Sequence, residues 1–119
     1  MVPTFGCVAV DCPDSLALAE FYAAVLEWPA PTVRFDGNWV DITGPKGQVI
    51  AFQRVENYRA PEWPGQTVPQ QMHLDLDVAD LDAGQARIEA LGARLLDDKP
   101  ETFRVFADPA GHPFCLCAC

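Results

Sequence analysis

The sequence repeats one pattern, and this internal duplication restricts the folds that the chain can form. A shift of 66 residues places Cys7 on His73 and Asp14 on Asp80, with matching apolar residues around them. A shift of 64 residues aligns GPKGQVIAF with DPAGHPFCL. Because a repeated segment tends to build the same supersecondary unit each time, the sequence predicts two similar halves of roughly 50 residues.

Each half is expected to begin with a strand that leads into a helix. In CVAVD and in HLDLDV, apolar residues occupy every second position, which is the period of a strand with one apolar face. Asp14 and Asp80 are suited to cap the helices that follow, and Gly92 is suited to end the second helix. Short extended runs and a Gly-containing turn come next, so each half reads as strand, helix and three strands.

The length and composition are those of one domain. The chain has 119 residues, and 50% of them are apolar, which suffices for a core without crosslinks. We expect a single domain over residues 1–119, with a first module over about 4–56 and a second over about 70–119. The connector between them, about 57–69, contains Pro61, Pro64 and Pro69 and is not expected to form a regular element.

The charge balance excludes some classes of partner. Seventeen acidic residues against eight basic ones give a net charge of −9, which repels nucleic acid and anionic membrane surfaces. This acidity either favours a cationic ligand or simply serves solubility. No apolar run approaches the ~20 residues that span a bilayer, and no secretory leader is recognised, so a cytoplasmic location is expected.

Three of the five cysteines lie in the last five residues. The odd number and the missing secretory context predict reduced thiols. Cys115, Cys117 and Cys119 alternate with other residues, so they are expected to share one face of a final strand.

The mixed faces of the predicted strands supply the candidate site. If the apolar faces pack on the helices, the opposite faces carry the candidate ligand-binding residues Cys7, Asp11, Trp39, Asp41, Ala51, Gln53, His73, Asp75 and Cys115. His73 is also the candidate catalytic residue, because an imidazole can serve as a base or a metal ligand; a plain hydrogen-bonding role is the alternative. The facing of residues 103–106 is ambiguous, because only Arg104 among them is polar.

Other side chains extend this picture of a ligand site. Trp39, Tyr58 and Trp63 are suited to stack on a planar ligand, although the last two could instead cover an edge of the core. Asp75 and Asp77 either attract positive charge or simply face solvent. The sequence has no glycine-rich phosphate loop and no serine nucleophile elbow, which sets aside phosphoryl and acyl transfer.

The chain resembles a known superfamily in several stretches. CVAVDCPDSLALAEFYAAVLEW, IAFQRV, PQQMHLDLDVADLDAGQARIEALGARLL and RVFADPAGHPFCL are similar to the vicinal oxygen chelate proteins, and most of all to the glyoxalase-like domain branch. The superfamily includes glyoxalase I, extradiol dioxygenases, and the bleomycin and fosfomycin resistance proteins. The resemblance implies an α+β fold of two tandem βαβββ modules that form a curved mixed sheet with helices on its outer face. It also implies a small-molecule ligand and a homodimer.

The resemblance further implies where a metal would bind in this chain. Metal-dependent relatives use histidine or glutamine and then glutamate on the first and last strands of each module, and those positions correspond here to Cys7, Ala51, His73 and Cys115. Only His73 matches, and both glutamates are missing, so glyoxalase I activity and a cofactor are not expected.

Three functions therefore remain open. The first is a metal-free small-molecule binding protein of the bleomycin resistance type. The second is a metal-dependent lyase, isomerase or dioxygenase-like enzyme with an atypical site at Cys7, His73 and Cys115, whose two thiols and imidazole suit zinc. The third is a scaffold that mainly dimerises.

Overall fold

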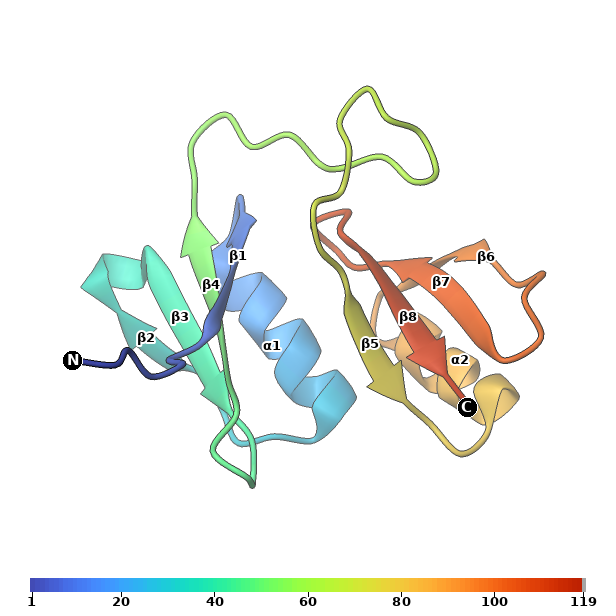
Figure 1. The fold of residues 1–119 in the computed structure, drawn as a ribbon, viewed down its shortest axis with the longest axis horizontal. Helices are drawn as coiled ribbons and strands as arrows, with labels where there is room; N and C mark the ends of the chain where they lie inside the picture. Colours follow the sequence, from blue (N-terminus) through green and yellow to red (C-terminus); the bar gives the residue numbers. More distant parts are fainter. Residues whose placement is uncertain (119) are drawn as a thin grey trace. The chain divides into compact units, whose positions relative to one another are not determined.

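The computed structural model describes residues 1–118, which form two units of the same design (Figure 1). The first unit, Met1–Tyr58, contains β1 (Val8–Cys12), α1 (Ser15–Leu26), β2 (Thr32–Arg34), the short 3-10 helix η1 (Phe35–Gly37), β3 (Trp39–Thr43) and β4 (Val49–Arg54). The second, from Arg59 onward, contains β5 (Leu74–Asp77), α2 (Leu81–Ala90), β6 (Arg94–Asp97), β7 (Phe103–Ala107) and β8 (Pro113–Cys117). The predicted α+β fold of two tandem βαβββ modules is confirmed. The prediction for Cys119 lies outside the described residues.

The two sheets have the same strand order, so the repeat in the sequence is a repeat in topology. The orders are β1-β4-β3-β2 and β5-β8-β7-β6. In each sheet, the first strand of the module is parallel to the last strand, and the remaining pairs are antiparallel. The first and last strands of a module are therefore neighbours, although they lie far apart in the chain.

The first unit is organised around α1, which packs on β3 and β4. Tyr22 stacks on Phe52 of β4 with ring centroids 5.7 Å apart, and Phe21 meets Tyr22 edge to face at 5.0 Å. These aromatic rings are buried and fix the side of the sheet that faces the helix. Asp14 begins α1 as predicted, because its carboxylate accepts a hydrogen bond from the amide of Ala17 at 3.1 Å.

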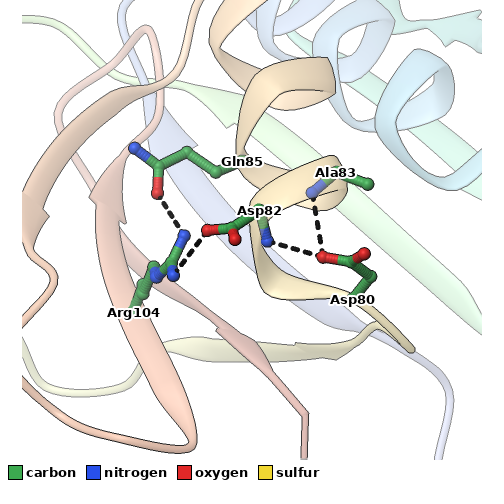
Figure 2. A network of polar contacts seen from close by, with 5 residues as sticks. All are labelled: Asp80, Asp82, Ala83, Gln85 and Arg104. Atoms are coloured by element: carbon green, nitrogen blue, oxygen red, sulfur yellow. Dashed lines mark hydrogen bonds and ion pairs between the residues drawn. The ribbon is translucent and has the colours of Figure 1, made fainter.

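The second unit fastens α2 to its sheet by polar contacts as well as by apolar ones. Asp80 accepts hydrogen bonds from the amides of Asp82 and Ala83, as the sequence predicted for a helix cap. Arg104 of β7 donates to Gln85 at 2.7 Å and to Asp82 at 2.8 Å (Figure 2). The sequence left open which residues of β7 face the helix. Arg104 faces α2, so its neighbours Phe103 and Val105 face the other side of the sheet.

A close approach of α2 to β8 depends on a glycine. A Cβ atom at Gly84 would lie 3.1 Å from Cδ1 of Leu116 and 3.2 Å from Cγ1 of Val78. Both distances are shorter than ordinary van der Waals contact, so a larger side chain at this position would push the helix away from the sheet.

Neither α1 nor α2, the two α-helices of residues 1–118, has the length and apolar character that a membrane-spanning helix needs.

We expect Gly84→Val to lower the free energy of unfolding by roughly 1–3 kcal/mol, because the added methyl groups overpack the contact with Leu116. Urea denaturation followed by circular dichroism measures the change. Ala86→Val is the matched control, because Ala86 is exposed on the same helix and the substitution there costs only helix propensity, about 0.6 kcal/mol. Equal losses in the two variants would contradict the packing argument.

Candidate functional site

Each sheet has one side that faces away from its own helix, and we call this side the distal face. Cross-strand partners share a side, so the register of each sheet identifies the residues on this face. The distal face of the first unit carries Ala9, Asp11, Trp39, Asp41, Ala51 and Gln53, and that of the second unit carries Asp75, Asp77, Phe103, Val105, Cys115 and Cys117.

On the first distal face, one row of cross-strand partners runs from Trp39 through Gln53 to Asp11. Trp39 is half-buried, whereas Gln53 and Asp11 are exposed. The row therefore offers an aromatic surface at one end and a carboxylate at the other. The indole and the carboxylate stand on strands separated by one intervening strand, which corresponds to about 10 Å.

The neighbouring row of the first unit contains a nearly buried carboxylate that is already paired. Asp41 is 9% exposed, and its Oδ2 atom accepts a hydrogen bond from Nε of Arg34 at 2.8 Å. This hydrogen bond and the carboxylate charge raise the pKa of Arg34. Arg34 therefore offsets the charge of Asp41, which the sequence pattern had indicated as a ligand-binding residue.

The second distal face repeats the first row with different residues. Phe103, Cys117 and Asp77 are cross-strand partners, and they occupy the places of Trp39, Gln53 and Asp11 in the first unit. Phe103 is 38% exposed and Asp77 is exposed. Each unit therefore presents a row with an aromatic ring at one end and an aspartate at the other.

The other row of the second unit belongs to a cluster of three chemically reactive side chains. Asp75 of β5 lies opposite Cys115 of β8, and His73 directly precedes β5. Nε2 of His73 lies 3.1 Å from Oδ1 of Asp75, and one ligand atom from each of the three residues lies within 4.8 Å of the others. His73 and Asp75 are exposed, whereas Cys115 is 7% exposed.

The environment of Cys115 holds it as a thiol. Burial raises its pKa, and the negative charge of Asp75, a hydrogen bond to Asp75 and the proximity of Cys117 raise it further, to about 12. At pH 7, only about one molecule in 10⁵ therefore carries the thiolate. Since the thiolate is the nucleophilic form of cysteine, Cys115 is a hydrogen-bond donor in this arrangement and not an activated nucleophile.

The structure places the predicted site residues on two faces. Asp11, Trp39, Asp41, Ala51 and Gln53 share the first distal face. His73, Asp75 and Cys115 come together in the second unit. Cys7 directly precedes β1 in the first unit, so the predicted set of Cys7, His73 and Cys115 is not contained in either unit and remains a prediction.

Phe103 and Arg34 are among the residues of these faces that the sequence interpretation missed. Phe103 could have been found, because the shift of 64 residues that aligns the two closing turns also places it on Trp39. Arg34 gave no such signal, because its pairing with Asp41 depends on how β2 is aligned with β3.

The raised pKa of Cys115 predicts an unusual pH dependence of alkylation in reduced, chelator-treated protein. The iodoacetamide rate at Cys115 should rise about tenfold per pH unit up to at least pH 10, whereas the rate for an unperturbed cysteine in a short blocked peptide levels off above about pH 9. Fragment-ion mass spectrometry separates Cys115 from Cys117. Asp75→Asn should increase the alkylation rate of Cys115 at pH 8, because it removes the adjacent negative charge. Asp77→Asn is the control, since Asp77 lies two residues further along β5 and opposite Cys117. A plateau near pH 9 would show that Cys115 is an ordinary thiol.

Comparison with known proteins agrees with the observed fold. Residues 7–117 match the model of a family described as the glyoxalase-like domain. No functionally curated protein sequence matches the chain significantly.

Solved structures share the fold over nearly the whole chain. A variant of the fosfomycin resistance protein FosX from Listeria monocytogenes, complexed with Mn(II) and 1S,2S-dihydroxypropylphosphonic acid, has a TM-score of 0.71 at 15% identity, covering 99% of this chain and 91% of FosX. A glyoxalase/bleomycin resistance protein/dioxygenase family enzyme from Burkholderia phytofirmans has a TM-score of 0.70 at 17% identity, covering 93% and 94%. A possible glyoxalase from Bacillus cereus has a TM-score of 0.71 at 10% identity, covering 98% and 99%. At these identities the likeness shows the fold alone.

Proposed function

Because the chain belongs to the glyoxalase-like domain family, within the vicinal oxygen chelate superfamily, we propose that it binds a cationic, planar small molecule on the distal faces of its sheets. The proposal is carried by one observation. In each unit, a row of cross-strand partners joins an aromatic ring to an aspartate: Trp39 to Asp11, and Phe103 to Asp77.

The dimensions of these rows match a ligand of two or three fused rings. The aromatic residue and the aspartate stand two strand spacings apart, about 10 Å, so a planar molecule can stack on the ring while its charged end lies near the carboxylate. A positively charged ring system also gains from the negative face of an indole or phenyl ring. A neutral ligand of the same shape would keep the stacking and lose both electrostatic contributions.

The wider charge distribution supports the same class of ligand. The chain carries a net charge of −9, which raises the local concentration of cations near its surface. On the first distal face, Arg34 is paired with Asp41. On the second, Asp75 and Asp77 are successive distal residues of one strand.

The proposal predicts preferential binding of the N-methylacridinium cation over neutral acridine at pH 8, measured by isothermal titration calorimetry. Asp11→Asn and Asp77→Asn should each weaken cation binding, by up to about tenfold where the row is occupied. Trp39→Ala and Phe103→Ala should weaken both ligands, because stacking does not require charge. Affinity for the cation should fall as salt concentration rises.

Matched control variants distinguish binding at the two rows from non-specific attraction of cations by the negatively charged protein. Asp98→Asn makes the same charge change on an exposed residue outside both distal faces, and Phe35→Ala removes an exposed aromatic ring from η1. Both should leave binding unchanged. Equal affinity for the two ligands, or equal losses in the row variants and these controls, would refute the proposed site.

A second candidate function is proton transfer with His73 as the base. The contact of His73 with Asp75 at 3.1 Å favours it, because a carboxylate next to an imidazole orients the ring and selects its tautomer. The high pKa of Cys115 argues against a covalent mechanism through that thiol. For any substrate that the protein is found to convert, His73→Ala should abolish turnover. We propose that such a reaction would be of the lyase, isomerase or dioxygenase type. We also propose that the protein is a homodimer, and sedimentation equilibrium measures its oligomeric state.

A further inference from the structure

The cluster of His73, Asp75 and Cys115 offers three donor atoms of different chemistry at one point of the second distal face. An imidazole nitrogen, a carboxylate oxygen and a sulfur lie within 4.8 Å of one another. Asp75 of β5 and Cys115 of β8 are cross-strand partners in two parallel neighbouring strands, and His73 directly precedes β5. Two of the three donor residues are therefore held by the regular structure of the sheet.

The spacing of the donor atoms is close to that of ligands around one metal ion. In a tetrahedral zinc site with bonds of about 2.0–2.3 Å, two ligand atoms lie about 3.3–3.8 Å apart. The separation of His73 and Asp75 is 3.1 Å, and no pair in the cluster exceeds 4.8 Å. Closing the widest gap thus requires a movement of about 1 Å, which a side-chain torsion supplies without a backbone change.

The donor set favours a thiophilic divalent metal such as zinc. Manganese and magnesium prefer sites made of oxygen ligands, whereas thiolate and imidazole ligands are typical of zinc. His73 supplies an imidazole nitrogen to this set, and Cys115 supplies a sulfur. A metal that suits this set is therefore different from the Mn(II) in the FosX complex.

The local charges also favour a dication. The Asp75 carboxylate and the Cys115 sulfur lie opposite each other in the register of β5 and β8. A bound dication would attract both groups to one centre. The sulfur is buried while the imidazole and the carboxylate are exposed, so the site is open to ligands from the solvent side.

From these observations, we propose that His73, Asp75 and Cys115 form a zinc-type metal site, contained in the second unit, that has an open fourth coordination position. This proposal differs from the sequence-based expectation that no cofactor binds. It also differs from the atypical metal site considered from the sequence, Cys7, His73 and Cys115, because Asp75 takes the place of Cys7. When bound, such an ion polarises an oxygen of a ligand or of water at the open position. The site does not rest on the proposed cation-binding rows, because it uses none of their residues.

Cobalt(II) is a spectroscopic probe of this site that needs no substrate. Reduced, chelator-treated protein should bind one Co²⁺ per chain, with visible bands of tetrahedral cobalt and a thiolate-to-cobalt charge-transfer band in the ultraviolet. Zinc should displace the cobalt and abolish both signals. X-ray absorption of the zinc-loaded protein should then show one sulfur at about 2.3 Å and nitrogen or oxygen neighbours at about 2.0–2.1 Å.

Variants of the three ligands are compared with variants of nearby cysteines and of a nearby aspartate in the sequence. Cys115→Ser should remove the charge-transfer band, and His73→Ala and Asp75→Asn should weaken cobalt binding at least tenfold, as judged from loss of even an outer-shell partner. Cys117→Ser, Cys119→Ser and Asp77→Asn should retain the band and the affinity. Circular dichroism establishes that each variant is folded, and the X-ray absorption result on the unaltered chain does not depend on any variant.

Several outcomes would overturn the proposal. One is a wild-type protein that gives no charge-transfer band with cobalt. Another is a band that survives Cys115→Ser or disappears in Cys117→Ser or Cys119→Ser. A third is X-ray absorption that shows two sulfur neighbours of zinc, one of which is lost in Cys7→Ser. This result would support Cys7, His73 and Cys115 as the ligands and contradict the proposed set of His73, Asp75 and Cys115. Binding of N-methylacridinium to the chelator-treated protein is measured separately, so failure of the metal site and failure of the ligand rows are distinguishable.

Discussion

The parallel pairing of the first and last strands in each module is the constraint on which the rest of the structure depends. In the second unit it places Asp75 beside Cys115, and in the first it places Asp11 beside Gln53. A parallel pair requires a long crossover connection, which in both units contains the helix and two further strands. The helix then covers one side of the sheet, and the polar residues of the first and last strands are collected on the other.

The duplication supplies one scaffold with two different chemical outcomes. Both units keep the row of an aromatic residue, a polar residue and an aspartate. The adjacent row has diverged: the first unit has small Ala51 beside the ion pair of Asp41 with Arg34, whereas the second has Cys115 beside Asp75. The first unit therefore pairs its buried carboxylate internally, and the second brings an imidazole, a carboxylate and a thiol together.

Predictions from the sequence succeeded where the signal was local. Alternating residues identified the sides of β1, β4 and β5, and the short polar side chains at Asp14 and Asp80 identified the beginnings of both helices. The prediction was incomplete at β7, because an almost continuous apolar run has no alternation to read. There the sides of the strand were decided by the hydrogen bonds of Arg104 to α2.

The sequence by itself determined the two βαβββ modules, the helix caps and the residue types on the distal sides of β1, β4 and β5, because strand and helix periods and capping are properties of short segments. Only the tertiary structure decided that Asp41 is paired with Arg34, and that Asp75 joins His73 and Cys115 and raises the pKa of the thiol. The contact of Asp75 with Cys115 depends on the register of two strands that are distant in the chain, and that of Arg34 with Asp41 depends on the register of β2 against β3. Register follows from packing the whole sheet against its helix, which no short segment encodes.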